Sequence, residues 1–173
     1  TPERYLEAME GMLHGQLKSM QDFGDRVSKN STIWIQGESI ESVRRREEII
    51  RKVKKGRIEL EGSILIGRHC EIADGARIVD SVIDNYTRIG RNAIIERSAV
   101  MDRVEIGDRA EIRDSIIGRH STIRSSPAEA TRILQTSVIA DDTIVDAGCQ
   151  LVATRVYPHR HLSKQDLFEK TIN

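Results

Sequence analysis

A repeat of 17 residues, running from about Leu60 towards the C-terminus, constrains this chain more than any other feature of its sequence. The period is visible when Ser81-Val82-Ile83, Ser98-Ala99-Val100 and Ser115-Ile116-Ile117 are aligned, and each period divides into six, six and five residues. The aliphatic residues then fall into three columns. The columns are Ile66, Ile83, Val100, Ile117, Ile139 and Val156; Ile72, Ile89, Ile106, Ile123 and Val145; and Ile78, Ile95, Ile112, Leu134 and Leu151.

Small residues mostly stand two positions before these aliphatic ones. They are Cys70, Ala76, Ser81, Thr87, Ala93, Ser98, Ala110, Ser115, Ser121, Ser137, Thr143, Cys149 and Thr154. Because residues i and i+2 of a strand face the same side, each short strand directs one large and one small side chain into a narrow interior. Gly67, Gly90, Gly107 and Gly118 directly follow an aliphatic position, where we expect the chain to turn a corner with least strain. Three faces and three corners per repeat predict a triangular parallel β-helix.

The repeat changes its spacing once, between Ile117 and Ile139. That interval is 22 residues instead of 17, so five extra residues must be accommodated. We place them near Arg124-Ser125-Ser126-Pro127-Ala128-Glu129, because this stretch is rich in residues that form turns. The sequence therefore predicts one loop that protrudes from the coil.

The segments outside the repeat predict helices and one short strand. A helix is expected over residues 2–14, followed by a polar connection over 16–30 and a strand over 31–35. A second helix is expected over 40–55, with an apolar stripe of Ile40, Val43, Ile50 and Val53. The start Ser163-Lys164-Gln165-Asp166 is typical of a capped helix, which predicts a short tail helix using Leu167 and Phe168.

The expected fold class is thus mainly β: a triangular β-helix with N-terminal helices and a short C-terminal helix. We divide the chain into a helical and linker segment (1–57), the β-helix (58–162) and the tail helix (163–173). Trp34, the N-terminal helices and the tail are expected to cover the ends of the coil, because open strand edges invite further pairing.

Composition excludes several classes of function. Lys plus Arg and Asp plus Glu both number 27, so no net charge draws the chain to nucleic acid or to an anionic membrane. No apolar run approaches the roughly 20 residues of a spanning helix, and no secretory pattern is present, which predicts a cytoplasmic protein. Cys70 and Cys149 are expected to be reduced and buried. A charged fraction of 31% with four Asn is typical of a thermophilic source.

Units such as Ile66-Gly67-Arg68-His69-Cys70-Glu71 resemble the hexapeptide-repeat, left-handed β-helix family. The handedness is implied by this resemblance. Members of that family serve as acyltransferases, carbonic anhydrases and passive assembly domains, so the fold alone does not decide the function.

Two flanking stretches are similar to parts of sugar-1-phosphate nucleotidyltransferases, closest to the mannose-1-phosphate guanylyltransferase group. Thr1-Pro2-Glu3-Arg4-Tyr5-Leu6-Glu7-Ala8 resembles the segment that closes the nucleotidyltransferase domain, and Val156-Tyr157-Pro158-His159-Arg160-His161-Leu162 resembles the end of the β-helix. The resemblance implies a C-terminal assembly and regulatory domain of an enzyme that makes nucleotide sugars. It places the Gly-rich loop, the Mg²⁺ ligands and the sites for nucleoside triphosphate and sugar-1-phosphate before Thr1.

The candidate site residues each have two interpretations. His69 and His120, which are 51 residues apart, suit an acyltransferase base or a solvated corner. His159 and His161, with His120, suit a metal site or an ordinary surface. The basic residues of the second helix suit a phosphate patch or a solvated face, and Asp80, Asp84, Asp102 and Asp114 are assigned to outward or corner positions. The basic residues are Arg44, Arg45, Arg46, Arg51, Lys52, Lys54 and Lys55.

We favour the structural interpretation of each. No catalytic or metal-binding residue is therefore assigned, residues binding a cofactor are left unassigned, and no cofactor is expected in this chain. We expect it to form homo-oligomers through the β-helix and the helices, and to be inactive alone. The alternatives are a sugar-phosphate acetyltransferase using acetyl-CoA and a purely structural β-helix.

Overall fold

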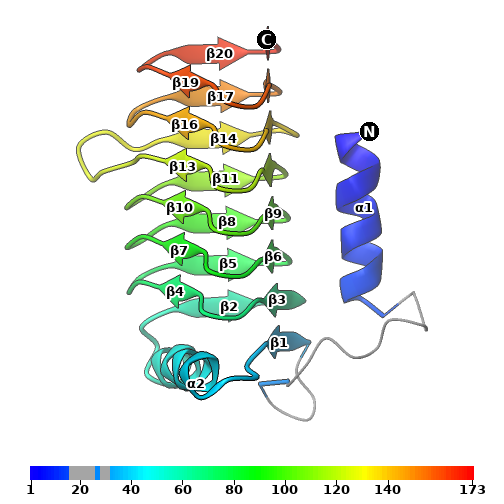
Figure 1. The fold of residues 1–173 in the computed structure, drawn as a ribbon, viewed down its shortest axis with the longest axis vertical. Coiled ribbons are helices and arrows are strands. Elements are labelled where there is room, and N and C mark those ends of the chain that lie inside the picture. The colour runs from blue at the N-terminus through cyan, green and yellow to red at the C-terminus, as the bar shows by residue number, and fades with distance from the viewer. Residues whose placement is uncertain (16–25, 28–31) are drawn as a thin grey trace.

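A computed structural model describes residues 1–15, 26–27 and 32–173 of the chain. The repeat forms a left-handed parallel β-helix of about seven turns, drawn in Figure 1 as a prism with its axis vertical. The fold class is confirmed. Most of the predicted polar connection over 16–30 lies outside the described residues.

Three parallel sheets form the faces of the prism. Sheet A contains β1 (Ile33–Ile35), β3 (Ile64–Ile66), β6 (Val82–Ile83), β9 (Ala99–Val100), β12 (Ile116–Ile117), β15 (Val138–Ile139), β18 (Arg155–Val156) and β21 (Thr171–Ile172). Sheet B contains β2 (Glu59–Glu61), β5 (Arg77–Val79), β8 (Ile94–Glu96), β11 (Glu111–Arg113), β14 (Arg132–Leu134), β17 (Gln150–Val152) and β20 (Asp166–Phe168). Sheet C contains β4 (Glu71–Ile72), β7 (Arg88–Ile89), β10 (Glu105–Ile106), β13 (Thr122–Ile123), β16 (Ile144–Val145) and β19 (His161–Leu162).

The three aliphatic columns fill the interior, with one correction. Ile133 pairs with Ile112 and Leu151 and is fully buried, whereas Leu134, the predicted member, faces outward and is partly exposed. The reason is that the five extra residues are divided. Four lie in the loop between β13 and β14, and one lengthens the next corner, where Gln135 and Thr136 both have positive φ.

The small inward residues build a hydrogen-bonded ladder at the corner between sheets B and A. The Ser81 hydroxyl donates to the carbonyl of Val79 over 2.7 Å and accepts the backbone N–H of Ser98 over 3.1 Å. The Ser98 hydroxyl accepts the N–H of Ser115 one turn later, again over 3.1 Å. Serine therefore fits the narrow interior while leaving no polar group unsatisfied.

The structure shows why a residue without a Cβ is needed at these corners. Gly67, Gly90, Gly107 and Gly118 do not have positive φ. A Cβ on Gly90 would instead lie 2.5 Å from the backbone of Gly107 in the next turn, so glycine is required by the close approach of successive turns. The left-handed backbone conformations mostly belong to other corner residues, such as His69 and Asp80.

Helix α1 (Pro2–Leu13) covers the outer face of sheet A, as Figure 1 shows. Thr1 caps it by accepting the N–H of Arg4. Met9 and Leu13 are buried against an apolar stripe on the outside of the sheet. The stripe consists of Leu65, Val82, Ala99, Met101 and Ile116.

Neither of the two described helices has the length and apolar composition of a membrane-spanning segment.

Helix α2 (Ile40–Lys54) closes the N-terminal end of the prism together with β1. Ser39 and Ser42 form its capping box. Ile49 is the apolar helix residue that becomes fully buried, whereas Ile40 is 93% exposed. The predicted stripe is therefore wrong at Ile40, because the face that meets the core is centred on Ile49.

The predicted tail helix is wrong, because the tail forms the last turn of the prism. Strands β19, β20 and β21 pair with β16, β17 and β18, and they align Leu162, Leu167 and Ile172 with the three inward columns. The sequence Ser163 to Asp166 has a local helix-start pattern, but the tail pairs with the preceding strands instead. This pairing provides hydrogen-bond partners for the backbone N–H and C=O groups and extends the apolar core.

Candidate functional site

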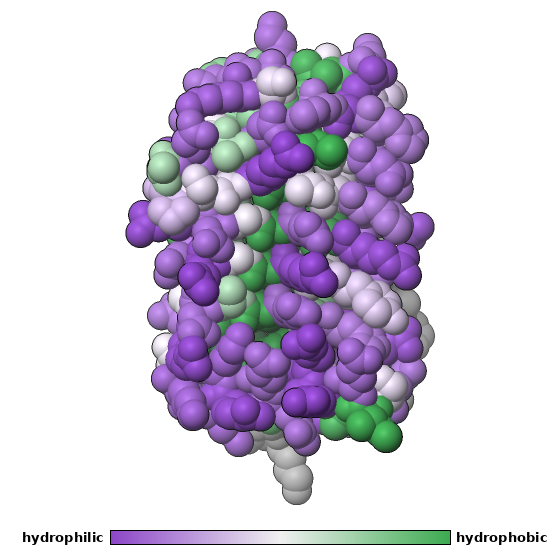
Figure 2. Space-filling view, turned by 60° about the vertical axis from the view of Figure 1, so that its left-hand side comes forward, coloured by the Kyte–Doolittle hydropathy of each residue, from purple (hydrophilic) through white to green (hydrophobic). Residues whose placement is uncertain are grey.

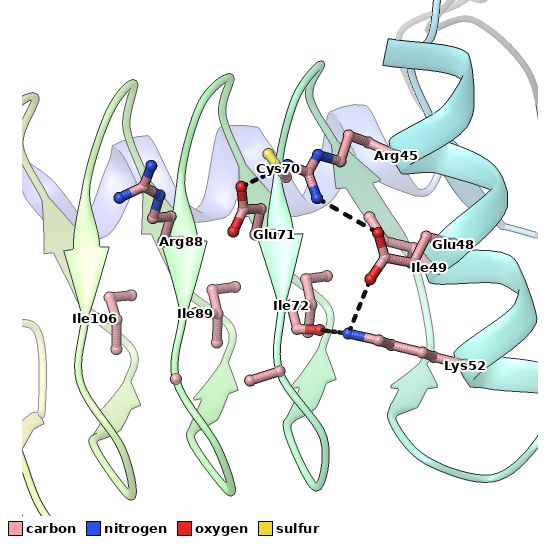
Figure 3. A pocket seen from close by; sticks show the side chains of 12 residues that line it. Arg45, Glu48, Ile49, Lys52, Cys70, Glu71, Ile72, Arg88, Ile89 and Ile106 are labelled. Carbon is pink, nitrogen blue, oxygen red and sulfur yellow. Dashed lines mark hydrogen bonds and ion pairs between the residues drawn. The ribbon is translucent and has the colours of Figure 1, made fainter. Parts of the chain in front are cut away.

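A shallow groove follows the outer face of sheet C from α2 to the loop between β13 and β14. Its part nearest α2 encloses about 260 Å³ and is drawn in Figure 3. Ile72, Ile89 and Ile106 line it, with Glu71 and Arg88 beside them. On the face drawn in Figure 2, a narrow hydrophobic strip runs between rows of hydrophilic side chains.

Ion pairs from α2 form one wall of this groove. Arg45 lies 3.0 Å from Glu71 and 3.4 Å from Glu48, and Lys52 lies 3.4 Å from Glu48. Lys52 also donates to the carbonyl oxygen of Ile72 over 2.7 Å, which ties the helix to the first strand of sheet C. Because these cations face carboxylates, the arrangement is suited to holding α2 in place rather than to binding a free phosphate.

The basic residues of α2 therefore fall into two groups. Arg44, Arg51, Lys54 and Lys55 are exposed, in agreement with a solvated face. Lys52 is only 20% exposed and Arg45 is partly covered, so these two residues belong to the contact with the prism. Arg45, Ile49 and Lys52 are spaced at i, i+4 and i+7, which places them on one face of the helix. This spacing was the signal in the sequence that the two cations lie beside the buried Ile49.

One corner of the prism, between sheets A and C, carries a stack of side chains that we call the corner ladder. Its residues all have φ between 55 and 60°. They are His69, Tyr86, Arg103, His120, Asp142 and His159. The ring of His69 stacks on Tyr86 with centroids 4.8 Å apart, and the Arg103 guanidinium lies 5.2 Å from the centroid of Tyr86.

The corner ladder places His69 and His120 on one corner, as their spacing predicts. Tyr86 and Arg103 lie between them along the ladder, so the two imidazoles do not form a pair. Among the described residues, no carboxylate lies within ion-pair distance of either ring. A general base is commonly oriented by a hydrogen-bonding partner, and the described ion pairs supply none to these two rings.

His159 and His161 diverge towards different carboxylates. His159 Nδ1 lies 3.7 Å from Asp142, whereas His161 Nε2 lies 3.0 Å from Asp146. Hydrogen bonds from His161 and then from Arg124 hold the pKa of Asp146 below its usual value. In the part of the chain that the structure describes, no three His, Cys, Asp or Glu side chains form a group that could hold a metal ion.

The four aspartates considered from the sequence each contact a nearby group. Asp80 accepts the backbone N–H of Ser63 over 2.9 Å, and Asp84 accepts that of Asn85 over 2.7 Å. The other two pair with arginines: Asp102 lies 3.0 Å from Arg103, and Asp114 lies 2.6 Å from Arg97. These carboxylates stabilise corners of the coil.

A buried carboxylate on sheet B escaped the sequence analysis. Glu96 is 6% exposed, lies 3.0 Å from Arg77 in the turn before it, and also pairs with Arg113 in the turn after it. The interval of 17 residues between Glu96 and Arg113 was the available signal, because it places both in one outward column. With an arginine on each side, Glu96 links three turns of the prism.

Both cysteines are free and buried, as the sequence predicts. Burial raises the pKa of Cys70 to about 12 and also raises that of Cys149. The thiolate is the reactive form of cysteine, so these residues act as small apolar groups of the interior.

These features define the class of protein: a left-handed β-helix domain whose polar side chains form structural ladders. The family described as GMPPB C-terminal domain matches residues 60–172. The chain therefore belongs to this family, the C-terminal β-helix of mannose-1-phosphate guanylyltransferase-like proteins. No curated protein matches the chain.

Solved structures similar to this chain include two of Caulobacter crescentus. One is a point mutant of GDP-perosamine N-acetyl transferase in complex with CoA and GDP-perosamine, with 13% identity, a TM-score of 0.54, and coverage of 75% of this chain and 60% of that one. The other is PerB in complex with the same two ligands, with 14% identity, a TM-score of 0.53, and coverage of 75% and 61%. The chain thus spans about three fifths of their length. At this identity the similarity concerns the fold.

Proposed function

We propose that this chain is the assembly and regulatory domain of a sugar-1-phosphate nucleotidyltransferase that makes nucleotide sugars. The family match over residues 60–172 carries the proposal. In this proposal, the nucleoside triphosphate, the sugar-1-phosphate and Mg²⁺ bind to a catalytic domain outside the chain. The contribution of the β-helix is a rigid body on which subunits associate.

The ladders and ion pairs support a mechanical role. Glu96 and its two arginines connect turns on sheet B, and Lys52 and Arg45 fasten α2 to the first turn. Such contacts favour a stiff prism that transmits position between subunits.

A pyrophosphate-release assay tests this proposal. The purified chain is incubated with each nucleoside triphosphate, mannose-1-phosphate or glucose-1-phosphate, and Mg²⁺. We expect no turnover, while a protein that joins this chain to a nucleotidyltransferase domain should release pyrophosphate under the same conditions. Turnover by the chain alone, abolished by Asp114→Asn or Asp84→Asn, would contradict the proposal.

The acetyltransferase alternative has one observation in its favour, namely the fold shared with structures that contain CoA. The positions of His69 and His120 weigh against this alternative, because the two imidazoles do not contact each other and no described carboxylate forms an ion pair with either. Isothermal titration of the chain with acetyl-CoA separates the two functions. Micromolar binding that His120→Ala abolishes would support the acetyltransferase, whereas no heat of binding is expected from an assembly domain.

A further inference from the structure

A polar cleft of about 550 Å³ lies between the corner ladder and the outward row of sheet C. The ladder contributes His69, Tyr86 and Arg103 to one wall, and α2 contributes Glu41 and Arg45. The outward residues of sheet C in the cleft are Glu71, Arg88 and Glu105. The cleft therefore adjoins the apolar part of the groove in Figure 3, with which it shares Arg45, Glu71 and Arg88.

The lining of this polar cleft is balanced in charge. Three arginines and three glutamates line it, and none of the lining side chains is aliphatic. Arg45 lies 3.0 Å from Glu71, and Arg88 lies 3.3 Å from Glu105. An anionic ligand would have to displace a glutamate from its arginine, and a cationic ligand would have to displace an arginine from its glutamate. The lining is therefore suited to a neutral polar ligand.

Three groups in the polar cleft retain their capacity for hydrogen bonding. In the part of the chain that the structure describes, no hydrogen bond or ion pair involves the Glu41 carboxylate, the Tyr86 hydroxyl or the ring nitrogens of His69. The carboxylate accepts, the phenol both donates and accepts, and a neutral imidazole does one at each nitrogen. A ligand in the cleft would thus find both donors and acceptors.

Tyr86 is an unusual residue for its position in the coil. Its φ of 57° lies in the left-handed region, which strains a large side chain more than it strains Gly, Asn or Asp. Its side chain is 49% exposed, so packing in the core does not require it. The contacts of its ring with His69 and Arg103 restrict the ring, and they leave the hydroxyl available at a defined place in the cleft.

We propose that the polar cleft binds a neutral saccharide. A sugar hydroxyl donates to a carboxylate and accepts from a guanidinium at the same time, so it can bridge an Arg–Glu pair without separating its charges. Sugar phosphates and nucleotide sugars carry negative charge and lack this compatibility. The polar cleft is therefore a separate site from any that takes the substrates of the proposed nucleotidyl transfer.

A heteronuclear NMR titration of the purified chain tests this site. The neutral probes are methyl α-mannoside, methyl α-glucoside and maltose, and mannose-1-phosphate is the charged comparison. We expect at least one neutral probe to shift the amide signals of residues 69–71, 86–88 and 103–105. Mannose-1-phosphate should bind more weakly than methyl α-mannoside, because its phosphate competes with the glutamates for the arginines.

Two conservative variants, each with a matched control, locate the binding. Tyr86→Phe keeps the stacked ring and removes the hydroxyl, and Glu41→Gln removes one charge; each should weaken binding by about five- to tenfold. Tyr157→Phe and Glu47→Gln change exposed residues outside the cleft and should leave the affinity unchanged.

Three results would overturn the proposal: no shift with any neutral probe, tighter binding of mannose-1-phosphate than of methyl α-mannoside, or an affinity that Tyr86→Phe leaves unchanged. None of them bears on the proposed assembly role, because that role does not depend on a saccharide.

Discussion

The two ends of this prism are built differently. At the N-terminal end, the chain leaves the repeat and places an amphipathic helix over the core, so that Ile49 and Ile58 are almost fully buried. At the C-terminal end, the last described strand, Thr171–Ile172, continues the repeat, and Leu167 and Ile172 are partly exposed. The comparison indicates that a β-helix grows by repetition, and that its covers must come from outside the repeat.

The difference also predicts how strongly each end contributes to stability. The closed end has apolar burial, a charged hydrogen bond from Lys52 and ion pairs, which are contacts within one chain. At the C-terminal end, Leu167 and Ile172 continue the inward columns and are partly exposed. Mutations at the two ends should therefore lower the free energy of unfolding by different amounts.

The largest loss of stability is expected for a substitution in the middle of the prism. This loss is the value with which substitutions at the two ends are compared. Ile106 lies between Ile89 and Ile123 in a buried column. Ile106→Asp would bury a carboxylate with no partner, so we expect a loss of several kcal/mol in the free energy of unfolding, measured in urea by circular dichroism. The same change at Ile172, assayed at a concentration where the chain is monomeric, should cost much less, and equal losses would contradict the difference in burial.

The second effect concerns the cover of the closed end. Ile49→Ala removes a side chain that is 3% exposed, and we expect the free energy of unfolding to fall by about 2–4 kcal/mol. Ile40→Ala is the matched control on the same helix and should change it by less than about 0.5 kcal/mol. If both variants unfold like the wild type, α2 does not cover the core.

The third effect is the polar attachment of α2. Lys52→Met removes the ammonium group that donates to the Ile72 carbonyl and faces Glu48, and a loss of about 1–2 kcal/mol in unfolding free energy is expected. Lys54→Met changes an exposed lysine on the same turn and serves as the control. Faster hydrogen exchange across α2 in the first variant only would confirm the attachment.

The smallest effect is a pH dependence near the C-terminal end of the prism. Because the pKa of Asp146 is lowered in the folded chain, its ionisation contributes stability above its ordinary value of 3.8, and this contribution is lost as pH falls through the folded pKa. Asp146→Asn should therefore lower Tm at pH 7 and match the wild type in strong acid. Asp166→Asn is the control at an exposed aspartate of the neighbouring turn. Parallel Tm curves for the wild type and Asp146→Asn would refute the assignment.

The interior of the β-helix was predictable because its signal is repeated. Sixteen aliphatic positions in one phase leave little freedom, and only Leu134 was misassigned, where two adjacent aliphatic residues follow an insertion. The period also holds information about charges. Glu96 and Arg113 are one period apart, so their contact follows from the register once the coil is known.

The ends were less predictable because each is formed only once. Ser163 to Asp166 has the local pattern of a helix start, yet pairing with the preceding turn decides its structure. In α2, apolar residues lie on more than one side, so the sequence alone does not identify Ile49 as the residue that meets the core. The close approach that requires Gly90 is likewise a contact between turns and leaves no local signal.

Sedimentation equilibrium of the purified chain tests the proposed assembly role most directly, because it measures the mass of the species in solution. We predict a mass that is a multiple of 19.6 kDa at micromolar concentration. A mass of 19.6 kDa at every concentration would contradict the account.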